Sequence, residues 1–358
     1  MLEKTLKELV EFYPQSEKQE NVKQLCKYVE KSLKNAGLFT SIFKNDGVYS
    51  LYAGTKGTKK TKLLLQAHID VVPGEGQGFR QTDNKYFGRG VYDMLFATAC
   101  FIKLINELKP NLKNYNLGIM LTGDEELGGF NGVKSLLDKG YSADLCILPD
   151  AGEGFGSLNI GAKGILILEL TVQGKAHHGS RPWEGDGAAS KMVKFLSEVE
   201  ELFDMSNTVN STVTIAKINS GDSENKGPAT ADCTLDIRYK SQDDLTRIYK
   251  HLNSLFLKYD VSIKNEKNGQ DYVLDKLNPY VQQFIKIYKK ENNGIINFTR
   301  AHGSSDARFF AEKNIPVIML RPDGGGAHGD EEWISKESIE KFYKLLKKFV
   351  TKFSRVNS

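Results

Sequence analysis

The chain has 358 residues, of which 40% are hydrophobic and 26% are charged, and its formal net charge at pH 7 is +4. This length exceeds what a single hydrophobic core organises well, so we expect two domains. The basic run Lys56–Lys62 lacks interleaved aromatic residues and is typical of a solvated turn, which argues against a nucleic-acid partner. We find no apolar stretch of membrane-spanning length and no signal-peptide pattern in Met1–Lys7, so we expect a cytoplasmic protein without a membrane partner.

The N-terminal part alternates helical and strand-like patterns. Apolar residues recur at helical spacing from Leu2 to Leu38, and Pro14–Ser16 divides this stretch into two helices, the second of which ends at Gly37. Three strands and a further helix are predicted to follow, at residues 40–43, 48–53, 63–69 and 95–108. Helices that alternate with buried strands predict an α/β domain with a mainly parallel sheet flanked by helices.

The pattern changes after residue 161. The strand Gly164–Val172 has no acidic residue at its end. The elements expected next are a helix, two strands, a helix and a strand, near residues 188–203, 212–218, 229–238, 243–257 and from 261. This βαββαβ order is that of ferredoxin-like domains. We therefore expect an inserted domain at residues 162–272, within a discontinuous domain that consists of residues 1–161 and 273–358.

Histidines and acidic residues stand at or just beyond the ends of short apolar runs in the discontinuous domain. The candidates are His68, Asp93, Glu126, Asp150 and His328. Buried strands deliver such groups to one edge of an α/β sheet, where ligands bind. Two imidazoles and three carboxylates form a mixed nitrogen and oxygen set that suits zinc, and the surplus of acids allows one to bridge two ions. A single acid at a strand end is more often a solvated loop residue or helix cap, but five such positions are hard to dismiss.

Two neighbours of these candidates suit supporting roles. Asp70 lies two residues after His68 and shares its face if the strand continues, as the carboxylate partner of a metal-bound imidazole does. Glu125 precedes Glu126 and points in a different direction, so one can bind metal while the other handles a proton.

In this combination and order, the motifs resemble those of the M20 metallopeptidases and deacylases, a family with acetylornithine deacetylase, succinyl-diaminopimelate desuccinylase, aminoacylases and several dipeptidases. The resemblance spans nearly the whole chain and implies a zinc-peptidase-like sheet with an inserted lid or dimerisation domain. It implies that His68 and Asp150 hold one zinc, that Glu126 and His328 hold the other, and that Asp93 bridges the two.

The resemblance also implies a mechanism. Asp70 would orient His68, and Glu125 would be the general base that takes a proton from a metal-activated water and delivers it to the leaving amine. The reaction would be hydrolysis of an amide bond in an N-acyl amino acid or a short peptide. Two zinc ions per subunit are expected, with cobalt or manganese as substitutes.

The inserted domain carries a second motif. The spacing of Gly174, His178, Pro182 and Gly185 is similar to the family's lid motif, whose histidine stabilises the oxyanion and often reaches the partner subunit's site. We expect His178 to take this role and the protein to be a homodimer through this domain. His177 is only one position away, so the spacing leaves open which of the two histidines takes this role. Either histidine, taken alone, is more often a structural residue.

The remaining candidates are expected to contact substrate. The resemblance assigns this role to Asn225, Arg238, Ser304, Ser305 and Arg308. The last three lie in a loop similar to one that helps to hold a substrate carboxylate in the family, and the planar guanidinium of Arg308 suits that contact. Taken by itself, Arg238 is equally well a surface cation at a strand end.

Three functions stay open at this point. We expect a di-zinc hydrolase of N-acyl amino acids, with a metallo-dipeptidase or aminopeptidase as the alternative and a non-catalytic binding module as a more distant one. Tyr92 departs from the family pattern, which has a small residue there, and so do Leu95 and Phe96, which stand where the family has a pair like Lys-Gly. Since Tyr92 adjoins Asp93, it could reshape the metal pocket or the substrate space.

Overall fold

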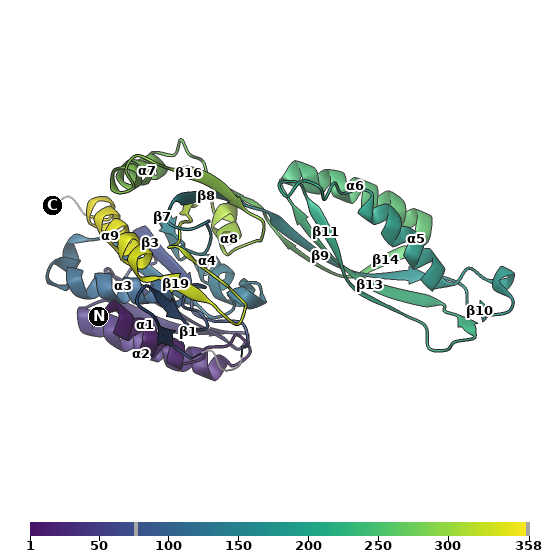
Figure 1. The fold of residues 1–358 in the computed structure, drawn as a ribbon, viewed down its shortest axis with the longest axis horizontal. Helices are drawn as coiled ribbons and strands as arrows, with labels where there is room; N and C mark the ends of the chain where they lie inside the picture. The colour runs from purple at the N-terminus through teal and green to yellow at the C-terminus, as the bar shows by residue number, and fades with distance from the viewer. Residues whose placement is uncertain (75–77, 356–358) are drawn as a thin grey trace. The chain divides into compact units, whose positions relative to one another are not determined.

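A computed structural model describes residues 1–74 and 78–355, which form two compact units (Figure 1). Unit 1 comprises residues 1–160, 273–300 and 305–358, and unit 2 comprises residues 161–272 and 301–304. The last four residues of unit 2 had been expected in the discontinuous domain. They group with unit 2 because β16 (Asn297–Ala301) runs beside β8 (Ser157–Ala162), the strand in which the chain passes from unit 1 into unit 2.

Unit 1 is built on a six-stranded sheet in the order β1-β2-β6-β3-β7-β17. Its strands are β1 (Phe39–Asn45), β2 (Val48–Gly54), β3 (Lys60–His68), β6 (Leu117–Thr122), β7 (Ser142–Ile147) and β17 (Val317–Ile318). The strands from β6 to β17 pair in parallel, whereas β1 and β2 are antiparallel. The turn at Asp46 and Gly47, whose φ angles of 44° and 84° are those of a two-residue hairpin, makes β1 antiparallel to β2.

Helices cover this sheet, as expected for an α/β domain. They are α1 (Leu2–Glu11), α2 (Gln19–Ala36), α3 (Leu95–Leu108), α4 (Ser135–Asp138), α7 (Pro279–Glu291), α8 (Ala307–Glu312) and α9 (Lys336–Phe353). Gly37 ends α2 in the left-handed conformation with φ 99°, which only glycine adopts at little cost. A small second sheet, in the order β18-β19-β5-β4, joins segments that are far apart in the chain. Its strands are β4 (Arg80–Gln81), β5 (Lys85–Phe87), β18 (Gly324–Gly325) and β19 (Trp333–Ser335).

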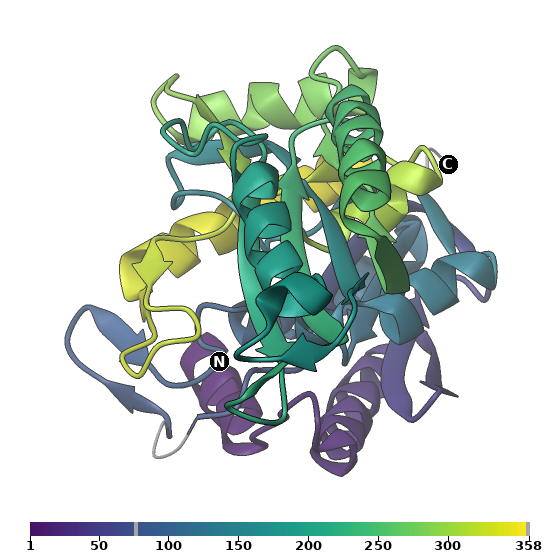
Figure 2. The same ribbon diagram turned by 90° about the vertical axis from the view of Figure 1, so that its right-hand side faces the viewer.

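Unit 2 confirms the predicted βαββαβ order. Its elements are β9 (Gly164–Gln173), α5 (Ala188–Glu200), β11 (Thr212–Ser220), β13 (Thr230–Tyr239), α6 (Gln242–Tyr259) and β14 (Val261–Gly269). The four strands form an antiparallel sheet in the order β11-β13-β9-β14. Both helices lie side by side on one face of this sheet (Figure 2).

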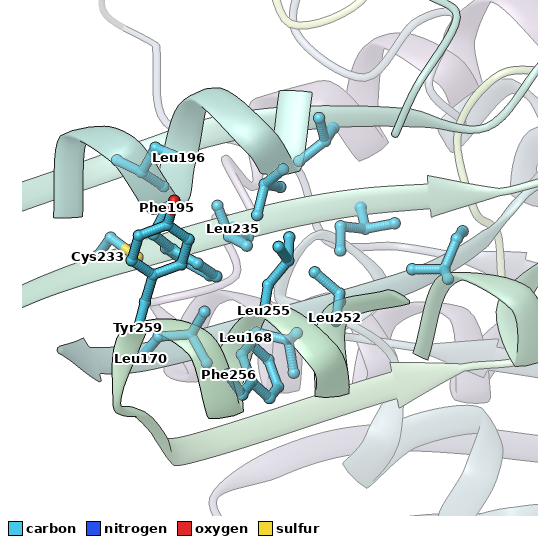
Figure 3. Close-up of a cluster of buried hydrophobic side chains, with 14 of the residues drawn as sticks. Leu168, Leu170, Phe195, Leu196, Cys233, Leu235, Leu252, Leu255, Phe256 and Tyr259 are labelled. Carbon is cyan, nitrogen blue, oxygen red and sulfur yellow. The ribbon is translucent and has the colours of Figure 1, made fainter. Parts of the chain in front are cut away.

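The core of unit 2 follows from the alternation of side chains along its strands. Leu168 and Leu170 of β9 and Leu235 of β13 point toward the helices and are buried against Phe195 of α5 and Phe256 of α6 (Figure 3). The residues between them point to the opposite face, which carries polar groups. The hydrophobic pattern therefore fixes which face of the sheet binds the helices.

Among the residues that the structure describes, none of the helices combines the length and apolar character that crossing a bilayer requires.

Candidate metal centre

The parallel strands of unit 1 bring the predicted polar residues to one edge. His68 is the last residue of β3, and it lies opposite Thr122, the last residue of β6. Glu125 and Glu126 follow within a short 3-10 turn, Glu125–Leu127. Asp150 follows β7, the other neighbour of β3. Residues that are distant in sequence thus meet because parallel strands end at the same side of a sheet.

Two groups of candidate ligands share Asp93. One group is His68, Asp93 and Asp150, and the other is Asp93, Glu126 and His328; within each group the ligand atoms lie within 4.8 Å of one another. Asp93 Oδ1 lies 3.3 Å from His68 Nε2, while Asp93 Oδ2 lies 3.3 Å from His328 Nε2. One carboxylate therefore presents a separate oxygen to each of two histidines.

The other two acids complete these groups. Asp150 Oδ1 lies 3.8 Å from His68 Nε2, and Glu126 Oε1 lies 3.1 Å from His328 Nε2. The donor set in each group is one imidazole nitrogen with carboxylate oxygens, which is a combination that zinc accepts. A third group of possible ligands, His68, Glu125 and Glu126, places Glu125 beside the same histidine.

The His68 ring is held by the main chain of Asp70. Nδ1 lies 2.9 Å from the Asp70 carbonyl oxygen and 3.6 Å from its carboxylate Oδ1. A carbonyl can only accept, so Nδ1 carries a proton, and Nε2, which faces Asp93 and Asp150, is the ring nitrogen available to a metal when it is unprotonated. The sequence pattern suggested the carboxylate as the nearer partner. The main-chain oxygen is nearer because β3 ends at His68 and Asp70 lies beyond the strand.

The carboxylate of Asp70 instead holds the turn that carries the two glutamates. Oδ1 accepts the N–H of Glu125 at 3.2 Å, and Oδ2 accepts the N–H of Glu126 at 3.2 Å. Ser16 Oγ donates to the same Oδ2 at 2.8 Å. Asp70 is fully buried, so these charge-assisted bonds fix both glutamates relative to His68.

The acids of the cluster carry perturbed pKa values. Burial, together with the charge of Asp150, raises the pKa of the Glu125 carboxyl well above its ordinary value. Burial likewise raises the pKa of Glu126 to about 7. The hydrogen bond to Asp93 raises the pKa of His328 to about 9. Carboxylates crowded in this way favour protons or a cation between them.

The pH dependence of the stability of the metal-free protein tests whether these acids are crowded. The pKa values of Glu126 and His328 are about 7 and about 9 in the folded chain, above ordinary values of about 4.3 and 6.5. The folded chain thus binds more protons than the unfolded chain, and the free energy of unfolding falls as the pH rises through these values. We expect the Tm of metal-free protein to decrease between about pH 5 and 9, and zinc to remove the decrease because it replaces the protons.

A Glu126→Gln variant is the control for that measurement, since it should lack the part of the decrease below about pH 7. A Tm that stays constant or rises over the same range in metal-free protein would contradict the assignment.

Arg308 is engaged within unit 1. It is 5% exposed, and its guanidinium donates to the main-chain oxygens of Ser305 and Gly128. Asp306 packs beneath the same turn, because a Cβ on Gly129 would lie 2.1 Å from Asp306 Oδ1. The pair therefore supports the turn that carries Glu125, an arrangement different from the open fork expected for a substrate carboxylate. Ser305 is also buried, and its Oγ accepts the N–H of Ala307 at 3.3 Å.

Nothing in the sequence pattern indicated that Asp306 is a buried acid. Burial, offset in part by the charge of Arg308, raises the pKa of Asp306 to about 8. An aspartate before a helix is normally a solvated cap, so only its environment identifies it.

His177 and His178 differ in their surroundings within unit 2. They form the short strand β10 (His177–His178), which pairs with β12 (Lys226–Gly227). The His177 ring lies against Gly227, where a Cβ would come within 2.0 Å of the ring. The His178 side chain is exposed, and its Nδ1 accepts the N–H of Ser180 at 3.2 Å.

Unit 2 brings only some of its predicted residues together. The carbonyl of Asn225 accepts the N–H of Gly179, next to His178, at 2.7 Å. Arg238 lies near the C-terminal end of β13, away from His178. There it forms a two-point ion pair with Asp236 at 2.7 and 2.9 Å. Ser304 groups with unit 2, whereas the adjacent Ser305 belongs to unit 1.

Tyr92, the residue that departs from the family pattern, is part of the packing of unit 1. Its side chain is 5% exposed, and the Arg321 guanidinium lies 4.2 Å from the ring centroid. The ring also covers Gly324, where a Cβ would approach it to 2.2 Å. The tyrosine is accommodated because glycine leaves this space open.

Comparisons with known proteins identify relatives over most of the chain. Over 357 residues, the chain is 24% identical to a succinyl-diaminopimelate desuccinylase of Rickettsia akari (strain Hartford), covering 91% of this chain and 93% of the relative. The desuccinylase of Pelagibacter ubique (strain HTCC1062) is 27% identical, and the match covers 92% of this chain and 93% of the relative.

Solved structures share the fold. A tripeptidase from Staphylococcus aureus subsp. aureus Mu50 superposes with a TM-score of 0.84 at 18% identity, covering 99% of this chain and 98% of the other. An M20 family metallo-carboxypeptidase from Sulfolobus solfataricus gives a TM-score of 0.78 at 17% identity, with 98% of both chains covered. The sequence profile of peptidase family M20/M25/M40 matches residues 64–352. The chain therefore belongs to peptidase family M20/M25/M40 and is a metal-dependent hydrolase that acts on C–N bonds.

Proposed function

We propose that this protein uses two zinc ions to hydrolyse the amide bond of N-acyl amino acids. The observation that carries the proposal is the position of Asp93, whose two oxygens each lie 3.3 Å from a different histidine, His68 or His328. Asp93 would bridge the ions, with His68 and Asp150 completing one site and Glu126 and His328 the other. Cobalt or manganese could replace zinc in the same nitrogen and oxygen donor set.

When bound, the metal ions would supply Lewis acidity that lowers the pKa of a water and polarises the scissile carbonyl. Glu125 would take the proton from the attacking water and deliver it to the leaving amine. Its position favours this role, since its main-chain N–H is held by Asp70. In the described part of the chain, no other residue forms a hydrogen bond with the Glu125 carboxylate, which leaves it free to exchange a proton.

His178 would stabilise the oxyanion. Because the Ser180 N–H can only donate, His178 Nδ1 is the acceptor and the proton of the neutral ring is on Nε2. This tautomer presents an N–H donor on the exposed side of the ring, as an oxyanion site requires. Asn225, Arg238, Ser304 and Ser305 would contact the substrate, with Arg308 supporting the loop.

We further propose a homodimer formed through unit 2. Arg238 pairs with Ile165 at the start of β9, whereas His178 follows the end of β9 at Gln173. Eight residues of strand separate these points, or about 26 Å at roughly 3.3 Å per residue, so one copy of unit 2 presents them far apart. A second copy would supply the missing residue to each site.

The edge strand β11 (Thr212–Ser220) offers a surface for the second copy. All of its residues after Ile215 are exposed, and Lys217 is its only charged residue. The other edge strand, β14, carries Lys264, Glu266 and Lys267, which discourage pairing.

Replacing His178 with alanine is expected to reduce kcat by roughly 10²- to 10³-fold, because one oxyanion donor is lost. The zinc content should not change, since His178 is outside both ligand groups. Kinetics and metal analysis of the purified variant measure both quantities. A comparable loss in His177→Ala, with His178→Ala fully active, would reverse the assignment.

The test of the proposed function is amine release from a panel of N-succinyl and N-acetyl amino acids and unblocked di- and tripeptides, with zinc or cobalt added. We expect hydrolysis of acylated amino acids. The similarity to desuccinylases over 91% and 92% of this chain is our reason to test N-succinyl substrates first. Hydrolysis confined to unblocked peptides would replace the proposal by a metallopeptidase. No hydrolysis despite two bound metals would favour a binding protein.

A further inference from the structure

A buried glutamate outside the ligand set holds the loop that carries Asp93. The Glu332 side chain is 1% exposed. Its Oε1 accepts the N–H groups of Tyr92 at 2.9 Å and Asp93 at 3.0 Å, and its Oε2 accepts the N–H of Gly90 at 2.9 Å. These three hydrogen bonds to one loop define the path of the main chain up to Asp93, the proposed bridging ligand.

The same carboxylate is linked to the loop of His328 through Arg89. Arg89 is 4% exposed; its Nη1 donates to Glu332 Oε2 at 3.1 Å and its Nη2 donates to the carbonyl of His328 at 3.3 Å. His328 has a φ of 64°, a conformation that residues other than glycine rarely adopt and that persists where neighbours hold it in place. The hydrogen bond from Arg89 is such a restraint.

The small second sheet explains why these residues meet. β5 pairs antiparallel with β19, with Phe87 opposite Trp333. The chain that leaves β5 therefore starts beside the chain that enters β19, and Gly88 N–H donates to the Glu332 carbonyl at 3.2 Å. Arg89 and Glu332 thus lie where the loop that carries Asp93 and the loop that carries His328 separate.

We propose that the Arg89–Glu332 pair is a positioning device for the metal centre, which sets Asp93 and His328 relative to each other. The proposal rests on the ligand set of the proposed function. It assigns to Glu332 the placement of the Asp93 main chain, and to Arg89 the placement of the His328 carbonyl. Partners of this kind, one step removed from the ligands, tune metal affinity because they determine the ligand geometry.

The test is the zinc and cobalt affinity of Glu332→Gln, measured by competition with a chelating dye. The amide keeps one acceptor oxygen, but its NH2 group would face the donors of Gly90 and Arg89. We expect zinc affinity to fall roughly 10- to 100-fold and the visible absorption of the cobalt form to change, with an unchanged far-UV CD spectrum. The matched control is Glu331→Gln, since the neighbouring Glu331 is exposed and pairs with Arg80 at the surface; it should bind metal like wild type.

A second variant covers the case in which Glu332→Gln does not fold. Arg89→Lys keeps the positive charge, but a single ammonium cannot reproduce the two-point contact with Glu332 and His328. We expect the same reduction in metal affinity for this variant. A folded Glu332→Gln, or in its place a folded Arg89→Lys, that binds zinc and cobalt as tightly as wild type overturns the proposal.

The Asp93→Ala variant distinguishes a failure of the positioning role from a failure of the proposed ligand set. If Asp93→Ala loses metal while the Glu332 and Arg89 variants do not, only the positioning role fails. If Asp93→Ala keeps both metals, the ligand set itself is wrong.

Discussion

Replacing Glu125 with glutamine is expected to lower kcat by roughly 10²- to 10⁴-fold while both metals stay bound. The carboxylate is the proposed proton carrier, and an amide of the same shape cannot accept a proton. The turn should persist, because Asp70 holds it through the main-chain N–H groups of Glu125 and Glu126. The measurements are steady-state kinetics on the best substrate of the panel and metal analysis of the same sample.

We expect that Glu125→Gln does not destabilise the folded state. Burial raises the pKa of Glu125 well above its ordinary value, so removing its charge relieves a cost in the metal-free protein. Glu153→Gln is the matched control, since Glu153 is an exposed acid in the loop after Asp150 and should leave kcat unchanged. Loss of one equivalent of metal from Glu125→Gln would instead identify Glu125 as a ligand, which its position beside His68 and Glu126 would permit.

Asp93→Ala is expected to weaken the binding of both metals, by more than about 100-fold at each site, because each would lose a direct ligand. A ligand of only one ion would affect one site. Asp150→Ala provides that comparison, since Asp150 belongs to one of the two groups that share Asp93. Metal content after dialysis and calorimetric titration with zinc measure the stoichiometry and the affinity.

Asp83→Ala is the control for Asp93→Ala, because Asp83 is an exposed aspartate outside both ligand groups. It should bind two metals. An Asp93→Ala protein with full zinc occupancy and unchanged affinity would exclude the bridge.

Much of the fold could be predicted from the local pattern of the chain. The apolar periodicity predicted the two N-terminal helices and the helix at residues 95–108 of unit 1, and the βαββαβ order of unit 2, because burial of one face is the main determinant of these elements. It did not predict the antiparallel pairing of β1 with β2, which follows from the turn conformation of Asp46 and Gly47. Strand direction depends on such turns and on pairing between distant segments.

The sequence by itself determined that His68 and Asp150 meet at the candidate metal centre, since they stand at the ends of strands that pair in parallel. Tertiary structure alone decided which atoms face one another. It directs the main-chain oxygen of Asp70 at His68, and it makes Glu332 the one buried acid of the run Asp330-Glu331-Glu332. The physical reason is that hydrogen bonding and burial depend on the packing of segments far apart in the chain, which residue type and spacing do not encode.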